Sequence, residues 1–165
     1  MLLAAVVLAG VAWLIVVLAR RRRWDGRFTA ALGEARWAAT VLATSLAEPT
    51  LSADATTLYW NESRPRLQAV QDELEALRST GPNEARRARA DQVAGELTAL
   101  TEAMSALVAL RGAVPDASDS DVSLQQSRTA VHEHSRSLQD VIGEQPVPQS
   151  PPPPAEPPGR AGDQP

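Results

Sequence analysis

His132 and His134, on either side of Glu133, are the side chains whose types come closest to a metal-binding motif. Two imidazoles of one helix share a metal ion when they lie about four residues apart, as in a His-Glu-x-x-His motif. A spacing of two residues places them about 200° apart around a helix. We therefore predict no metal site here, and we expect His134 on the packed side of its helix and His132 in solvent.

Asp116, Asp119 and Asp121 form an acidic cluster, but the glycine turn and later glutamate of a calcium loop are missing. Their position favours a role at the start of a helix. The chain also contains no glycine-rich phosphate loop and no recognisable Ser-His-Asp arrangement. We therefore predict a non-enzymatic protein with no catalytic, cofactor-binding or metal-binding residues and no small-molecule substrate.

Residues 2–19 carry no charge, and Arg20, Arg21, Arg22 and Arg23 follow them directly. Eighteen helical residues span about 27 Å, close to the roughly 30 Å of a bilayer's hydrocarbon core. Trp24 follows the arginines, where an indole suits the headgroup region. Residues 1–23 are thus predicted to be a single transmembrane signal-anchor that ends in an arginine stop.

The positive-inside rule places these arginines, and everything after them, in the cytoplasm. The N-terminus is then outside, and the lipid bilayer of the plasma membrane is the first predicted partner. Two alternatives are a cleaved signal peptide and an anchored protein whose body faces the envelope. A signal peptide would carry a basic region before the apolar run, which this chain lacks.

Residues 24–143 contain eleven arginines and seventeen acidic residues, which gives a net charge of −6. Nucleic-acid binding calls for a basic patch, and the main arginine block adjoins the membrane segment. We therefore expect no nucleic-acid partner. All sixteen basic residues are arginine, as in bacterial proteins from GC-rich genomes, and the absence of cysteine excludes disulfides and thiolate metal sites.

The same region shows apolar residues at alternating spacings of three and four, which is typical of packed helices. Breaks at Pro49, Pro82 and Pro115 separate the repeats. We predict helices at about 25–47, 53–79, 83–111 and 120–143. Short connections make neighbouring helices antiparallel, so the predicted fold class is all-α, a four-helix, coiled-coil-like bundle after the anchor. The first helix is expected to continue from the membrane segment, with Gly26 as the point of any bend.

Pro65 lies inside the second of these helices, where proline usually breaks or kinks the structure. The apolar stripe passes Pro65 without a change of phase, and the proline falls on the opposite side of the helix. This pattern predicts one kinked helix. The alternative is a break at residues 63–65 followed by a separate helix that Ser63 caps.

Trp37 and Val41 project away from the main apolar stripe of the first helix. One interpretation is a helix with neighbours on both sides. The other is a partner surface for a second copy or another protein at the membrane, because tryptophan in an apolar patch often marks an interface.

Residues 144–165 are rich in proline and are predicted to be a disordered tail. Taken together, the patterns predict a single-pass, membrane-anchored helical interaction or scaffold protein. The alternatives are an envelope-facing protein with the tail as a spacer, or a helical signalling protein of the membrane.

Overall fold

A computed structural model describes residues 2–113 and 119–143 of the chain, with side chains placed for residues 13–113 and 121–143. Asp116, the side chain of Asp119 and the tail 144–165 lie outside this description. The elements are α1 (Leu2–Trp37), a π-helical segment η1 (Ala38–Leu42), α2 (Ala43–Ala47), α3 (Ala53–Thr80), α4 (Glu84–Gly112) and α5 (Asp119–Gly143).

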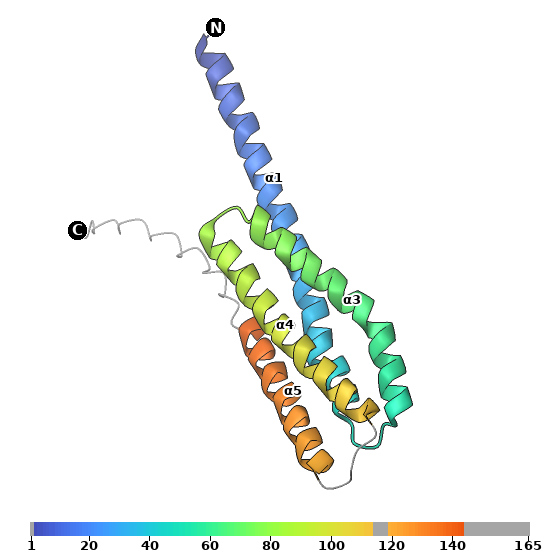
Figure 1. Ribbon diagram of the computed structural model, residues 1–165. Coiled ribbons are helices and arrows are strands. Elements are labelled where there is room, and N and C mark those ends of the chain that lie inside the picture. Colours follow the sequence, from blue (N-terminus) through green and yellow to red (C-terminus); the bar gives the residue numbers. More distant parts are fainter. Residues whose placement is uncertain (1, 114–118, 144–165) are drawn as a thin grey trace, which may run out of the picture.

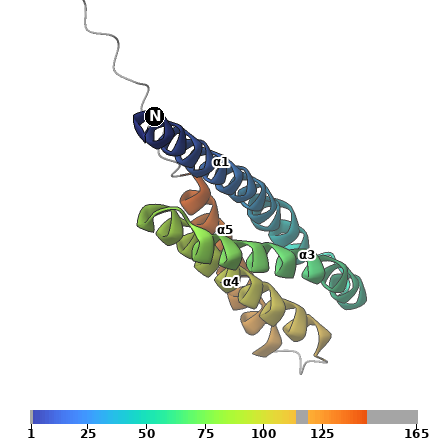
Figure 2. The same cartoon turned by 90° about the horizontal axis from the view of Figure 1, so that it is seen from above.

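The predicted all-α bundle of four helices is confirmed. The rod α1–η1–α2 counts as one bundle helix, and successive helices run in opposite directions (Figure 1). Helix α4 packs between α3 and α5, and the rod lies against α3 and α5, which closes the bundle (Figures 1 and 2). The N-terminal part of α1 extends beyond the other helices (Figure 1).

The core consists of the stripes that the heptad spacing indicates. On α4 six residues at these spacings are completely buried: Ala90, Val93, Leu97, Leu100, Met104 and Leu107. On α3 the buried residues follow the same alternating spacing and include two polar side chains: Thr56, Trp60, Ser63, Leu67, Val70, Leu74 and Leu77. Alternating spacings of three and four keep one face of each helix toward the bundle axis.

Helix α3 is continuous through Pro65, so the alternative of two separate helices is wrong. Pro65 is exposed, so the carbonyl that proline leaves without a backbone donor can bind water instead.

Helix α3 begins at an N-cap, where Ser52 Oγ accepts a hydrogen bond from Ala55 N at 3.2 Å. Helix α4 begins in the same way, with Asn83 Oδ1 accepting from Arg86 N at 2.9 Å. Both caps satisfy backbone donors at helix ends.

Helix α1 runs without interruption through the arginines and Gly26, as predicted, but the π-helical η1 was not predicted. One widened turn lets Ala38, Ala39 and Leu42 all be buried. The Ser135 hydroxyl of α5 donates a hydrogen bond to the Ala39 carbonyl at 2.5 Å, and Ser135 is itself buried. A π-helical turn lacks regular i to i+4 hydrogen bonds, so a side-chain donor at this point supports the irregular backbone.

Among the described residues, one helix has the length and composition of a membrane span, and it is α4 rather than the predicted N-terminal segment. Of its most apolar window 33% is buried, which is the core stripe described above, and exposed or half-buried alanines contribute to the rest. Core helices of bundles share such a composition with membrane spans. Packing therefore explains the large apolar residues of α4.

Candidate membrane anchor and partner surface

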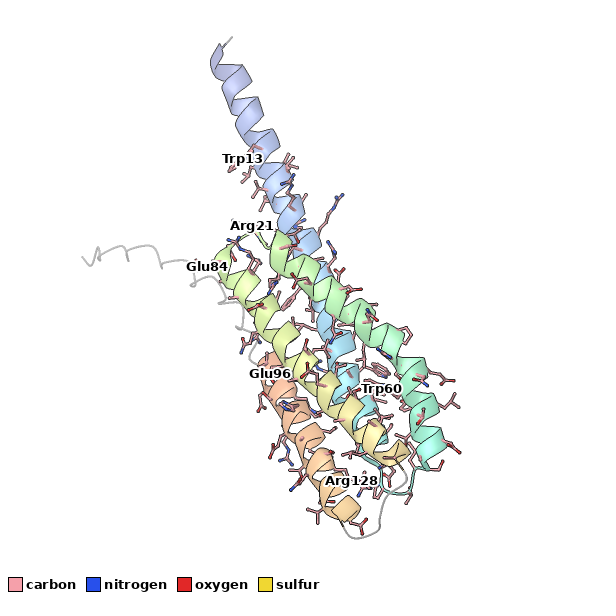
Figure 3. The ribbon with its side chains drawn as sticks, viewed as in Figure 1. Trp13, Arg21, Trp60, Glu84, Glu96 and Arg128 are labelled. Atoms are coloured by element: carbon pink, nitrogen blue, oxygen red, sulfur yellow. The ribbon has the colours of Figure 1, made fainter. Side chains whose placement is uncertain are left out.

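The four arginines Arg20–Arg23 lie on α1 as exposed side chains, at the point where the helix leaves the bundle. Figure 3 shows Arg21 near the level of the α3–α4 turn, and Trp13 farther out on the part of α1 that no other helix covers. The arginine block is thus located between an isolated apolar helix and a packed one.

Trp24 is buried in the bundle, whereas the sequence suggested a position among lipid headgroups. Its indole Nε1 donates a hydrogen bond to the Leu77 carbonyl of α3 at 3.0 Å. Its ring stacks on Phe28 with centroids 4.9 Å apart, and the Arg86 guanidinium lies 5.8 Å from the ring centroid. A buried indole needs a partner for its N–H, and the end of α3 supplies one.

Charged residues next to Trp24 link α1 to two other helices. Asp25 receives two hydrogen bonds from Arg86 of α4, at 3.0 and 3.2 Å. Arg27 makes two with Glu73 of α3, at 2.6 and 2.8 Å. Bidentate guanidinium–carboxylate pairs fix orientation as well as distance. The α1 segment that directly follows the arginine block is therefore held in a defined orientation on the bundle.

Trp37 is half-buried and packs against the core from the side of α3. The guanidinium of Arg66 lies 3.9 Å from the centroid of a Trp37 ring, and Arg66 Nε donates to Glu34 at 2.5 Å. Val41, one turn farther on, is 46% exposed. Trp37 therefore has α3 as a neighbour on this side, and the exposed Val41 lies beside it. Its role as a partner surface stays a prediction.

A groove of about 370 Å³ runs between α1 and α3 next to Trp37. Two ion pairs, Arg27–Glu73 and Glu34–Arg66, border it. Small apolar side chains lie between them, and the full lining is Arg27, Ala30, Ala31, Glu34, Arg66, Ala69, Val70 and Glu73. We call these eight residues, together with Trp37 and Val41, the α1–α3 face.

The two carboxylates of this face have lowered pKa values. The hydrogen bond from Arg66 lowers the pKa of Glu34, and the one from Arg27 lowers the pKa of Glu73, in each case against a smaller effect of burial. Hydrogen bonding to the charged form of an acid has this sign. Both glutamates are therefore charged at neutral pH, and the face carries two positive and two negative groups.

The opposite end of the bundle holds a contact that the sequence did not predict. Arg111 of α4 donates to Thr56 Oγ1 at 3.0 Å and to the Glu48 carbonyl at 2.6 Å. Burial, and then the nearby charge of Arg128, lower the pKa of Arg111. Arg111 thereby joins α4 to the α2–α3 connection. No pattern in the sequence pairs residues that lie so far apart along the chain.

The histidines occupy the positions expected from their spacing: His132 is exposed and His134 is half-buried. In the described part of the chain, no group of three or more His, Asp or Glu side chains could hold a metal ion. Asp121 is exposed at the start of α5.

No protein-family model, curated protein or solved structure matches the chain significantly.

Proposed function

We propose that this chain is a single-pass membrane protein whose cytoplasmic helical bundle presents an interaction surface close to the bilayer. In this arrangement residues 1–23 form the anchor, residues 24–143 the bundle and residues 144–165 a disordered tail. The α1–α3 face binds a protein partner. We propose no catalytic activity for the chain.

One observation carries the anchor: four consecutive large apolar side chains are exposed on the projecting part of α1. Trp13, Leu14, Ile15 and Val16 are 69%, 52%, 60% and 52% exposed. Four consecutive residues, at about 100° each, cover nearly the whole circumference of a helix. A helix in water would leave at least one polar side, and an apolar surface on every side suits lipid.

Helix α4 is a poorer candidate for the span. Its large apolar residues are buried apart from the half-buried Leu110, and they pack against α3 and α5. Moving α4 into a bilayer would remove Leu97 and Leu100 from the core, and the bundle would unfold. Orientation follows from Arg20–Arg23 on the bundle side of the apolar stretch.

A reporter fusion tests both the anchor and its orientation. An enzyme that is active only outside the membrane is fused after Gln164, and a second fusion carries a reporter active only inside. We expect membrane fractionation to recover both fusions with the lipid and activity from the inside reporter alone. Activity from the outside reporter would instead support an envelope-facing bundle, and a fusion recovered free of membranes would overturn the anchor.

A further inference from the structure

The ion pairs of the α1–α3 face run across the groove at two levels. At the level nearer the arginine block, Arg27 on α1 faces Glu73 on α3. Two turns farther on, Glu34 on α1 faces Arg66 on α3. All four side chains are between 33% and 51% exposed, so each can reach a group outside the chain.

The charges of the face are balanced, with two arginines against two glutamates. A uniformly acidic partner would be attracted by the two arginines and repelled by the two glutamates, and a uniformly basic partner would experience the reverse. The best complement is a surface with the same alternation of charges at the same spacing. A second copy of the chain provides such a surface.

We infer that the α1–α3 face binds the same face of a second copy, with the two chains parallel about a two-fold axis along the membrane normal. This axis brings α1 of one copy opposite α3 of the other at the same level. Arg27 then meets the other copy's Glu73, and Glu34 meets its Arg66. Every cation is placed against an anion at both levels.

The parallel orientation rests on the proposed membrane anchor. An antiparallel dimer would also pair opposite charges, but it would direct the two N-terminal helices away from each other. Two anchors in one bilayer exclude that arrangement. The bilayer also raises the effective concentration of the second copy, so a small face suffices for association.

Small side chains make close approach feasible. Ala30 and Ala69 lie between the two ion pairs, so no bulky group separates the two copies there. Val41 extends the contact with apolar surface beyond the second ion pair, together with the part of Trp37 that Arg66 and the core leave uncovered. Buried tryptophan is a frequent source of binding energy in interfaces, whereas exposed ion pairs mainly set the register.

Cysteine crosslinking distinguishes the two orientations, because the native chain contains no cysteine. Full-length Ala30→Cys and Ala69→Cys chains are mixed in phosphatidylcholine vesicles and oxidised. In the parallel dimer Ala30 of one copy lies opposite Ala69 of the other, so the mixture should crosslink well and either variant alone poorly. Efficient crosslinking of Ala30→Cys alone indicates the antiparallel arrangement and overturns the inference. Ala106→Cys, exposed on α4, is the control partner that should not crosslink to Ala30→Cys.

Charge reversal tests the pairing itself. One variant carries Arg27→Glu with Arg66→Glu, which makes the face acidic, and the other carries Glu34→Arg with Glu73→Arg, which makes it basic. Energy transfer between fluorescent proteins fused to the C-terminus reports association in vesicles. We expect each variant alone to associate about tenfold more weakly than the native chain, and the mixture to recover. Equal association of all samples, or no recovery in the mixture of folded variants, overturns the inference.

Control experiments separate this inference from its premises. The exposed pair Arg87→Glu and Glu102→Arg on α4 should leave association unchanged. Circular dichroism checks the fold of each variant. If a charge-reversed variant unfolds, the cysteine crosslinking experiment alone tests the dimer.

Flotation with vesicles tests the anchor independently, so a native chain that floats but is monomeric refutes the dimer only. If removal of residues 144–165 exposes the Ala30→Cys thiol to a maleimide, the tail covers the face and the inference fails.

Discussion

The projecting part of α1 and the helix α4 are both strongly apolar, yet the bundle uses them in opposite ways. The large apolar residues of α4 lie on its packed side, where Leu97, Leu100 and Leu107 are fully buried, and the other faces carry mainly alanine among their apolar residues. On α1, residues 13–16 are apolar in every direction, and all four side chains are more than half exposed. The comparison shows that two strongly apolar helices differ in where their large side chains lie: on one packed side of α4, and around the whole circumference of α1 at residues 13–16.

The largest expected effect is a loss of folding stability from a substitution in the buried core of α4. Leu100→Asp places an unpaired charge in a site with no exposed surface, and we expect a loss of at least about 4 kcal/mol of folding free energy. Thr98→Asp, on the exposed side of the same helix, should change stability little. Denaturant unfolding of the full chain in detergent micelles, followed by circular dichroism, measures both. Similar losses for the two variants would contradict the assignment of the core.

The matching change on the projecting helix should leave the bundle intact. Leu14→Arg introduces a charge where α1 has no helical neighbour, so the unfolding midpoint should stay the same. Membrane partitioning should weaken by about 2–3 kcal/mol, the cost of arginine within a spanning helix. Vesicle flotation provides the readout, and Leu14→Ile is the conservative control. A bundle destabilised by Leu14→Arg would show that this segment packs against protein after all.

A smaller effect is expected at the junction between the two regions. Trp24→Phe keeps an aromatic ring next to Phe28 but removes the hydrogen bond to the Leu77 carbonyl. The expected loss is about 1 kcal/mol, because one buried acceptor is left without a partner. Thermal unfolding of the full chain in micelles measures the change. No loss at all would mean that water replaces the indole N–H, and that the junction is looser than the geometry indicates.

The smallest effect concerns pH. Glu34 and Glu73 have lowered pKa values in the folded state, so their stabilising contribution is complete at neutral pH and is lost as pH falls through those values. Stability should therefore decline below about pH 4–5, near the ordinary pKa of glutamate. Replacing both by glutamine should flatten this part of the stability profile. A steeper decline in the double variant would show that other carboxylates dominate.

Much of the bundle was predictable because it depends on local patterns. Proline, serine and asparagine mark the turns, so α3 and α4 begin and end within one residue of the predicted positions. The stripes of both helices are buried, since residues spaced alternately by three and four lie on one face of a helix. Continuity through Pro65 followed from the unbroken phase of that repeat.

The surface around Trp37 was only half predictable. The spacing showed that Trp37 lies off the main stripe, but it did not show which residue covers the indole ring. Arg66 stacks on the Trp37 ring and pairs with Glu34, which is 32 residues away along the chain. Trp24 was misplaced for a similar reason, because its hydrogen-bond acceptor Leu77 is 53 residues distant. Spacing along one helix carries no information about the polar groups of another.

The sequence by itself determined the helices, their buried faces and the all-α class, because each depends on residues within a few turns of one another. The tertiary structure decided which charges meet across helices, how Trp24 and Asp25 hold α1 on the bundle, and where the rod widens into a π-turn at η1. These features depend on distances between residues far apart in the chain. Only the packed bundle brings Ser135 to the Ala39 carbonyl, and only there do Arg27 and Glu73 form a pair.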